Sequence, residues 1–206
     1  KNWCKIDFEN GMANPLYYAK KLYLNGDAVT SLSVNNLANI KEIKNNAFTH
    51  WNGTSITIPK SVTEIGNSAF SSCSSLQTIV FESSSILTRI GGNAFGGTKV
   101  VNIEIPKSVT EIDGSAFSGT SLQTIVFESG SNLTKIGNSA FLFSSLKSIR
   151  IPSKVTIIEA NAFTYCDALS SVTFESGSKL SSLGAASFSD CLNLQEIVMP
   201  ASVTSI

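Results

Sequence analysis

The feature that most constrains this chain is a ten-residue stretch that returns almost letter for letter. Residues 61–70 read SVTEIGNSAF, and residues 108–117 read SVTEIDGSAF. Looser copies follow the same pattern, and the phenylalanines that close the copies are Phe48, Phe70, Phe95, Phe117, Phe141, Phe163 and Phe188. Consecutive members lie 22 to 25 residues apart. A fixed short period of this kind predicts a solenoid, in which each unit contacts only its neighbours.

Each unit also contains a strand-like segment of the form apolar-x-x-apolar-x-apolar. Its last two apolar positions alternate with polar or variable ones, which is typical of a half-buried strand. One short strand per unit leaves too few residues for an antiparallel return, so we expect the strands to form a parallel ladder. The eight segments cover residues 29–34, 56–58, 76–81, 100–105, 122–127, 146–151, 169–174 and 194–199.

The residue that follows the strand alternates along the chain. Proline follows four strands, as Pro59, Pro106, Pro152 and Pro200, and glutamate follows three, as Glu82, Glu128 and Glu175. Because proline has no backbone N–H, it cannot continue a ladder and ends a strand. The glutamate units carry the longer, serine-rich loop, so two repeats of together about 46–47 residues form the true unit.

The second half of each unit places an apolar residue four positions before an alanine, as at Ile65 and Ala69. This spacing predicts a single helical or 3-10 turn with both side chains on one face. The phenylalanine that follows the alanine is then expected to stack on its counterparts as a spine through the core.

Residues 1–28 do not fit the repeat and are rich in aromatic side chains. Solenoids need an atypical terminal unit to cover the first repeat, so we predict an N-terminal capping segment over 1–28 and repeats over 29–206. Tyr17 and Tyr18 could form a binding patch, but we favour their packing in the cap. The chain begins without methionine and stops at Ile206 part-way through a repeat, and we expect it to be a piece of a longer protein.

Charge and hydropathy exclude several classes of function. Fifteen basic residues balance fifteen acidic ones, at a pI of about 6.8, which argues against nucleic acid or an anionic membrane as the partner. No apolar run approaches the ~20 residues of a membrane-spanning helix. We therefore expect no nucleic-acid binding and no membrane insertion of this segment.

The residues from Ile58 to Ile79 resemble one known family closely. The pattern Ile-Pro-x-Ser-Val-Thr, followed by Ile65, Ala69-Phe70, Cys73 and Leu76, is similar to the BspA-like leucine-rich repeats, and the resemblance covers about residues 29–206. It implies an α/β-type, right-handed leucine-rich repeat solenoid of about seven to eight units. It also implies a secreted or cell-surface protein, since some family members adhere to host matrix proteins.

We find no residues arranged for catalysis, for a cofactor or for a metal. His50 is the only histidine, so a histidine metal site or acid–base dyad is hard to build, and we interpret it as a surface residue. Cys73, Cys166 and Cys191 each lie three residues after a spine phenylalanine. Buried thiols are the favoured interpretation, and a Cys166–Cys191 disulfide is the alternative. Cys4 is uninformative.

The outward positions of the strands form the candidate binding surface. Its partner would be an extracellular or host protein of matrix type, or a glycan, and a merely solvated sheet face is the equally weighted alternative. The candidates are Thr57, Thr78, Val80, Asn102, Glu104, Thr124, Val126, Ser148, Arg150, Ser171, Thr173, Glu196 and Val198. The predicted function is a non-catalytic interaction module, and the alternative is a rigid spacer. Apolar positions Ile197, Met199, Val203 and Ile206 also predict possible end-to-end self-association.

Overall fold

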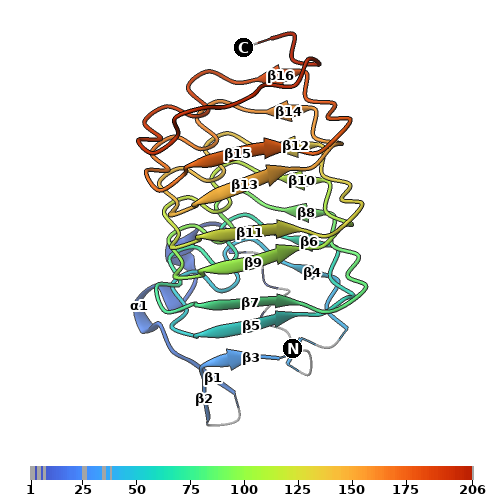
Figure 1. Cartoon of the computed structure of the whole chain (residues 1–206). Helices are drawn as coiled ribbons and strands as arrows, with labels where there is room; N and C mark the ends of the chain where they lie inside the picture. The colour runs from blue at the N-terminus through green and yellow to red at the C-terminus, as the bar shows by residue number, and fades with distance from the viewer. Residues whose placement is uncertain are drawn as a thin grey trace.

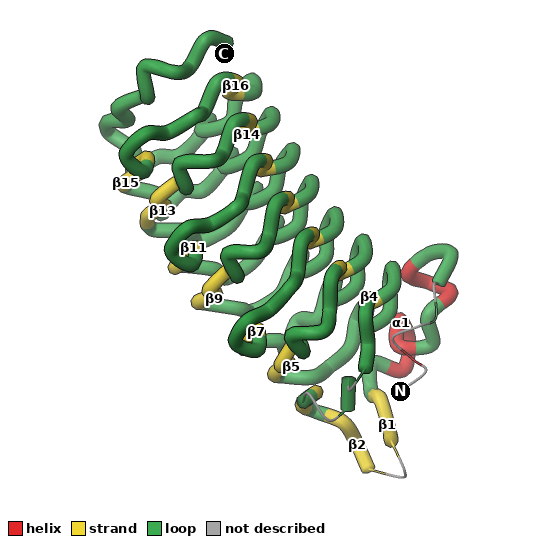
Figure 2. The backbone as a smooth tube through the Cα atoms, turned by 90° about the vertical axis from the view of Figure 1, so that its right-hand side faces the viewer, coloured by secondary structure: helices red, strands yellow, loops and turns green. Residues whose placement is uncertain are grey.

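The chain folds as a solenoid of about seven turns, each of which carries two short parallel strands (Figure 1). The computed structural model describes residues 3, 6, 8–24, 27–33, 36–37 and 39–205, so the expectations placed on Cys4, Val34 and Ile206 lie outside it. The predicted fold class is confirmed. The turns stack along one axis, with the strands of the two sheets on opposite sides of the tube (Figure 2).

The first sheet contains the predicted strands. Its members alternate exposed and buried positions, so that Ile56 and Ile58 of one strand enter the core while Thr57 faces outward. The strands are β3 (Ser31–Leu32), β5 (Ser55–Ile58), β7 (Thr78–Phe81), β9 (Asn102–Ile105), β11 (Thr124–Phe127), β13 (Ser148–Ile151) and β15 (Ser171–Phe174).

The eighth predicted strand, over 194–199, is not formed. Val198 in this segment is 73% exposed. The segment precedes Pro200 and follows a turn in which Glu175 comes directly after the strand, and strand pairing is weak at junctions of this kind, as described below. Within the described residues it has no further strand on its other side to pair with.

The second sheet lies just before the predicted helical or 3-10 turns, which form as non-helical turns with i→i−3 hydrogen bonds, as from the N–H of Ala69 to Gly66 at 3.3 Å. Seven two-residue strands pair in parallel along the array. They are β4 (Glu42–Ile43), β6 (Glu64–Ile65), β8 (Arg89–Ile90), β10 (Glu111–Ile112), β12 (Lys135–Ile136), β14 (Ile157–Ile158) and β16 (Ser182–Leu183).

The backbone hydrogen bonds explain why no helix forms after these strands. The N–H of Phe70 donates to the carbonyl of Ala94 in the next turn at 2.7 Å, and the N–H of Gly66 donates to Ile43 in the preceding turn at 2.7 Å. A helix would instead direct these donors back along the chain to the residue four positions earlier. Ser68, between them, is left-handed with φ 54°, which turns the chain.

The core is a continuous stack of phenylalanine rings. Neighbouring rings from Phe48 to Phe188 lie 5.1 to 5.5 Å apart between centroids, with interplanar angles of 1° to 21°. Every ring from Phe48 to Phe163 is buried. The predicted spine is therefore present and runs unbroken through both kinds of repeat.

The cysteines of the repeats are free and buried. The thiols of Cys73, Cys166 and Cys191 each contact a spine carbonyl, at 3.0 Å to Phe48, 3.1 Å to Phe141 and 3.1 Å to Phe163. Burial raises the pKa of Cys73 to about 12 and that of Cys166 to about 11. Buried thiols were the favoured interpretation, and the Cys166–Cys191 disulfide is not formed.

The N-terminal segment packs on the first turn. It contains the 3-10 helix η2 (Gly11–Ala13), the helix α1 (Leu16–Ala19) and an antiparallel pair, β1 (Leu22–Leu24) with β2 (Asp27–Val29), at one end of the array (Figure 2). Asn14 Nδ2 donates to the carbonyl of Ala47 at 3.0 Å, and Leu16 is buried. These contacts support our proposal that residues 1–28 cap the array, although the β1–β2 pair continues across the predicted boundary to Val29.

One prediction about this segment is wrong. Tyr18 is 78% exposed and does not pack in the cap, because the short helix α1 directs Leu16 inward and leaves Tyr18 on its outer side. Tyr17 is half-buried and contacts both Tyr18 and the ring of His50, with centroid distances of 4.8 and 4.6 Å.

Candidate functional site

The structure places the candidate residues of six strands, from β5 to β15, on one face of the first sheet. The parallel register aligns Thr57 with Val80, Glu104 with Val126 and Arg150 with Thr173. Thr57 is half-exposed, and the other strand residues of the candidate surface are exposed. Glu196 and Val198 are exposed as well, but they lie on the segment beyond β15 that forms no strand.

Charge on this face is sparse and of both signs. Arg150 Nε lies 3.9 Å from Glu175 Oε1, and the Arg150 side chain is 71% exposed. An exposed pair at this distance contributes little to stability. The face therefore offers neutral polar groups and valines rather than a field of one sign.

Side chains that could ligate a metal do not gather anywhere in the described part of the chain. This part contains no group of three His, Cys, Asp or Glu residues placed to hold a metal ion. His50 is half-buried rather than fully on the surface, and burial first, then the charge of Lys20, lowers its pKa. No helix among the described residues is long and apolar enough to span a bilayer.

From β5 onward, the strands of the first sheet are joined by two kinds of junction. We call a strand Pro-type or Glu-type after the residue that follows it. At each Pro-to-Glu junction, between β5 and β7, β9 and β11, and β13 and β15, four residue pairs are in register. At the Glu-to-Pro junctions, β11 and β13 share one pair, and β7 and β9, both fully described, share none. Figure 1 accordingly shows these strands standing in pairs.

Proline explains the difference. At a Pro-to-Glu junction the glutamate N–H donates to the carbonyl that ends the preceding strand, as from Glu128 to Ile105 at 3.0 Å. At a Glu-to-Pro junction the equivalent residue, such as Pro106, has no N–H to donate to Phe81. The ladder is therefore interrupted between β7 and β9 and reduced to one pair between β11 and β13.

The glutamate side chains add a second link across the Pro-to-Glu junctions. Each carboxylate accepts the N–H of the residue after the preceding proline, at 2.9 Å from Lys60 to Glu82 and 2.9 Å from Lys107 to Glu128. Glu175 accepts from Ser153 in the same way at 3.0 Å. Each proline turn and the glutamate turn after it thus form a two-turn module.

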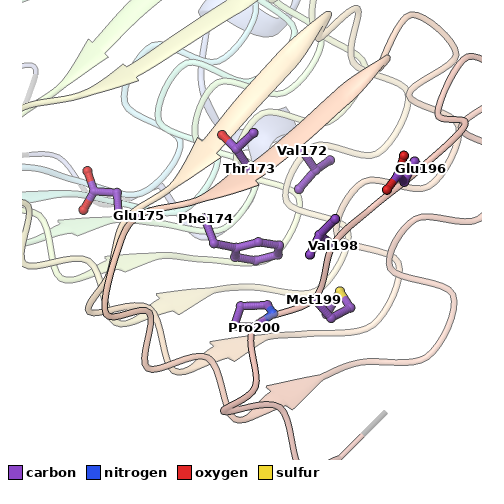
Figure 3. Close-up of a pocket in the computed structure, with 8 residues that line it drawn as sticks. All are labelled: Val172, Thr173, Phe174, Glu175, Glu196, Val198, Met199 and Pro200. Carbon is purple, nitrogen blue, oxygen red and sulfur yellow. The ribbon is translucent and has the colours of Figure 1, made fainter.

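The outer face is hollowed where these modules meet. A shallow hollow of about 280 Å³ lies beside the opening between β7 and β9, lined by Ile79, Ile103 and Val126 among others. A second, of about 570 Å³, lies between β15 and the segment that ends at Pro200. Figure 3 shows Phe174, Val198 and Pro200 around this second hollow.

Exposed valines stand on the strands beside these hollows. Val80 and Val126 are 48% and 49% exposed, and Val198 is 73% exposed. A hollow that is flanked by apolar side chains can accept an apolar side chain of a partner. The sequence predicts these outward positions, but it does not predict the hollows, because they depend on which strands pair.

Sequence reasoning also missed two exposed aromatic residues away from the sheet face. Phe143 and Tyr165 each lie two residues after a spine phenylalanine, and their rings stack 4.8 Å apart at an interplanar angle of 4°. Both have left-handed backbones, with φ 58° and 57°, which for such bulky residues costs on the order of 1 kcal/mol. Their 22-residue spacing was the signal that could have found them.

The stacked turns and their two parallel ladders define a repeat solenoid. A family model of the BspA type leucine-rich repeat region matches in six copies, over residues 26–119 and 88–206. The chain therefore belongs to the BspA type leucine-rich repeat family, whose repeats form protein-interaction modules. No curated protein sequence matches the chain.

Solved structures include similar bacterial proteins. A leucine-rich repeat protein from Bacteroides ovatus is 27% identical, with a TM-score of 0.58 over 90% of this chain and 51% of its own. A leucine rich cell surface protein from Faecalibacterium prausnitzii is 27% identical, with a TM-score of 0.46 over 78% of this chain and 46% of its own. The pneumococcal vaccine antigen PcpA is 21% identical, with a TM-score of 0.43 over 89% and 60%. The chain spans about half the length of the first two proteins.

Proposed function

We propose that this chain is a non-catalytic, cell-surface or secreted module that binds an extracellular protein through the outer face of the first sheet. A matrix-type protein is the partner class that this proposal favours, with a glycan as the second choice. Membership of the BspA type family supports the surface location. The cell-surface protein from Faecalibacterium prausnitzii is a precedent for that location in a similar protein.

The observation that carries the proposal is the combination of hollows and exposed valines on one face. Solenoids bind partners along extended faces of this kind. A few side chains that are desolvated at the centre of a contact contribute most of its affinity, whereas scattered exposed charges contribute little. Val80 on β7 and Val126, which lines the hollow from β11, are the central contacts that we propose.

Binding to a panel of immobilised matrix proteins and glycans tests the proposal. The test variant combines Val80→Lys, Val126→Lys and Arg150→Glu, which leaves the net charge unchanged. The matched control combines Ile86→Lys, Ile157→Lys and Lys179→Glu, three exposed positions outside the candidate surface, with the same charge changes. We expect the test variant to lose the signal and the control to keep it, with unchanged denaturation curves for both.

A rigid spacer is the alternative function. The unbroken spine and second sheet favour it, because they give the array the stiffness that a spacer needs. A silent panel, or a signal that the test variant keeps, would contradict the sheet-face proposal and favour the spacer.

A further inference from the structure

The stacked pair Phe143 and Tyr165 is open to solvent on the edge of the array. The side chains are 57% and 44% exposed, so they are not part of the core. Each follows a spine phenylalanine by two residues, and the N–H of Phe143 donates to Thr164 in the next turn at 3.1 Å. The two rings therefore lie in register on consecutive turns, as a small aromatic platform.

The backbone at these positions favours glycine rather than an aromatic residue. Gly97 and Gly119 occupy the equivalent positions of the two preceding turns, with φ 71° and 64°. A side chain at Gly119 would meet nothing within 4 Å. The turn that precedes Phe143 therefore has no side chain at this position to cover the Phe143 ring. The local backbone also gives no reason for an aromatic residue at this position.

Two aspartates follow the platform, one in the register of the next turn and one in the sequence. Asp190 occupies the same position as Tyr165 one turn later, and the N–H of Tyr165 donates to Ser189 at 3.0 Å. Asp167 follows Tyr165 by two residues.

These carboxylates are available to a ligand. Both are exposed, and neither takes part in any ion pair among the described residues. Asp190 accepts only the neighbouring Ser189 hydroxyl, at 2.8 Å. Leu192, which is 78% exposed, precedes Asn193, whose amide donates to the carbonyl of Asp167 at 2.7 Å. An exposed apolar side chain therefore lies next to the acidic groups.

We propose that the aromatic pair, Asp167, Asp190 and Leu192 form a binding site for an arginine side chain of a partner protein. A guanidinium is planar and stacks on aromatic faces while it donates hydrogen bonds to carboxylates. The apolar Leu192 suits the methylene stem of such a side chain. This site lies on the edge of the array, apart from the sheet face, and does not depend on the function proposed for that face.

Titration calorimetry and amide NMR shifts with a short Gly/Ser peptide that carries two arginines test the site. The control is the same peptide with citrulline in place of both arginines, which keeps the shape of the side chains and removes their charge. We expect saturable binding of the arginine peptide, weakened by added salt, and at least about tenfold weaker binding of the citrulline peptide. Equal binding of the two peptides, or no binding of the arginine peptide, would overturn the proposal.

Variants distinguish the site from general charge attraction. Phe143→Gly with Tyr165→Gly should fold normally, because glycine occupies this position in two other turns, and should abolish saturable binding. Asp167→Asn with Asp190→Asn should weaken it severalfold. Ser72→Gly, at the same left-handed position of another turn, is the control and should bind normally. A glycine double variant that still binds the peptide, or a wild-type chain that binds oligosaccharides but not the peptide, would refute an arginine site.

Discussion

The junction between β9 and β11 and the junction between β7 and β9 differ at one decisive residue. Glu128 donates its N–H to Ile105 across the first, and Pro106 has none to donate across the second. The first junction has four registered pairs and the second has none, with every residue of both junctions described. A single missing donor, repeated at every second turn, thus divides a regular solenoid into two-turn modules.

The opposite side of the array is not divided. The second sheet is continuous over seven strands, and the phenylalanine stack passes through both junctions at similar spacing. Ion pairs on this side cross the Glu-to-Pro junctions, as Arg89 with Asp113 and Lys135 with Glu159. The modules are therefore joined by the core and the second sheet, while the outer face of the first sheet is free to open.

The largest expected effect tests whether a spine phenylalanine contributes equally to stability in a proline turn and in a glutamate turn. Phe70→Ala and Phe95→Ala remove buried rings from a proline turn and a glutamate turn, and each should cost about 3–5 kcal/mol of unfolding free energy. Chemical denaturation measures both, with the exposed Gln77→Ala as a control. A much smaller loss for one of the two rings would mean that the spine is not equivalent in the two modules.

A smaller effect tests the glutamate link within a module. Glu128→Ala leaves the Lys107 N–H without its carboxylate partner and should destabilise the chain by about 1 kcal/mol. This loss is smaller than that of a buried hydrogen bond to a charged group, because the site is exposed. Glu128→Gln keeps an acceptor oxygen and should lose less than half of that. The neighbouring Ser129→Ala serves as the control in the same denaturation series. Equal losses for the alanine and glutamine variants would contradict the link.

The smallest effect tests the ion pairs that join modules. The hydrogen bond from Lys135, followed by that from the N–H of Asn138, lowers the pKa of Glu159, while burial opposes the shift. A lowered folded-state pKa means that the stabilisation is present above the ordinary value of 4.5 and is lost as the pH falls through the folded value. The pair is half-exposed, so the loss should be a few tenths of a kcal/mol.

Unfolding free energies of the wild type and Glu159→Gln between neutral and acidic pH measure this effect. The difference between the two proteins should be largest near neutral pH and should vanish at the acidic end. The exposed Glu196→Gln is the comparison for nonspecific charge effects. A difference that grows as the pH falls would contradict the assigned role of Lys135.

The period and apolar pattern predicted most of the architecture. The strands from Ser55 to Phe174, the spine and the strand-ending prolines follow from local chemistry, since burial and a missing N–H act on each unit alone. The second sheet could not be distinguished from a helical turn, because Ile65 and Ala69 share a buried face in either. The N–H of Phe70 donates to a carbonyl of the next turn, and the local sequence pattern does not predict this partner.

The candidate site was predictable only in part. Outward strand positions follow from period-two alternation, so the placement of Thr78, Val80 and Val126 could be derived. The hollows, the role of Glu128 and the failure of the segment at 194–199 to pair all depend on contacts between turns. Phe143 and Tyr165 were passed over because the binding surface was sought on the sheet face alone.

Residue-resolved hydrogen exchange on the native chain tests most directly whether the first sheet opens at each Glu-to-Pro junction. We expect slow exchange for the amides of Glu82, Glu128 and Glu175, which donate to the preceding strand. The amides of β9 and β13 that face the preceding Glu-type strand should exchange at least about a hundredfold faster, since local opening governs protection. In Pro106→Ala, the new amide at position 106 should slow exchange between β7 and β9. Uniform protection along the whole first sheet of the wild type would contradict the division into modules.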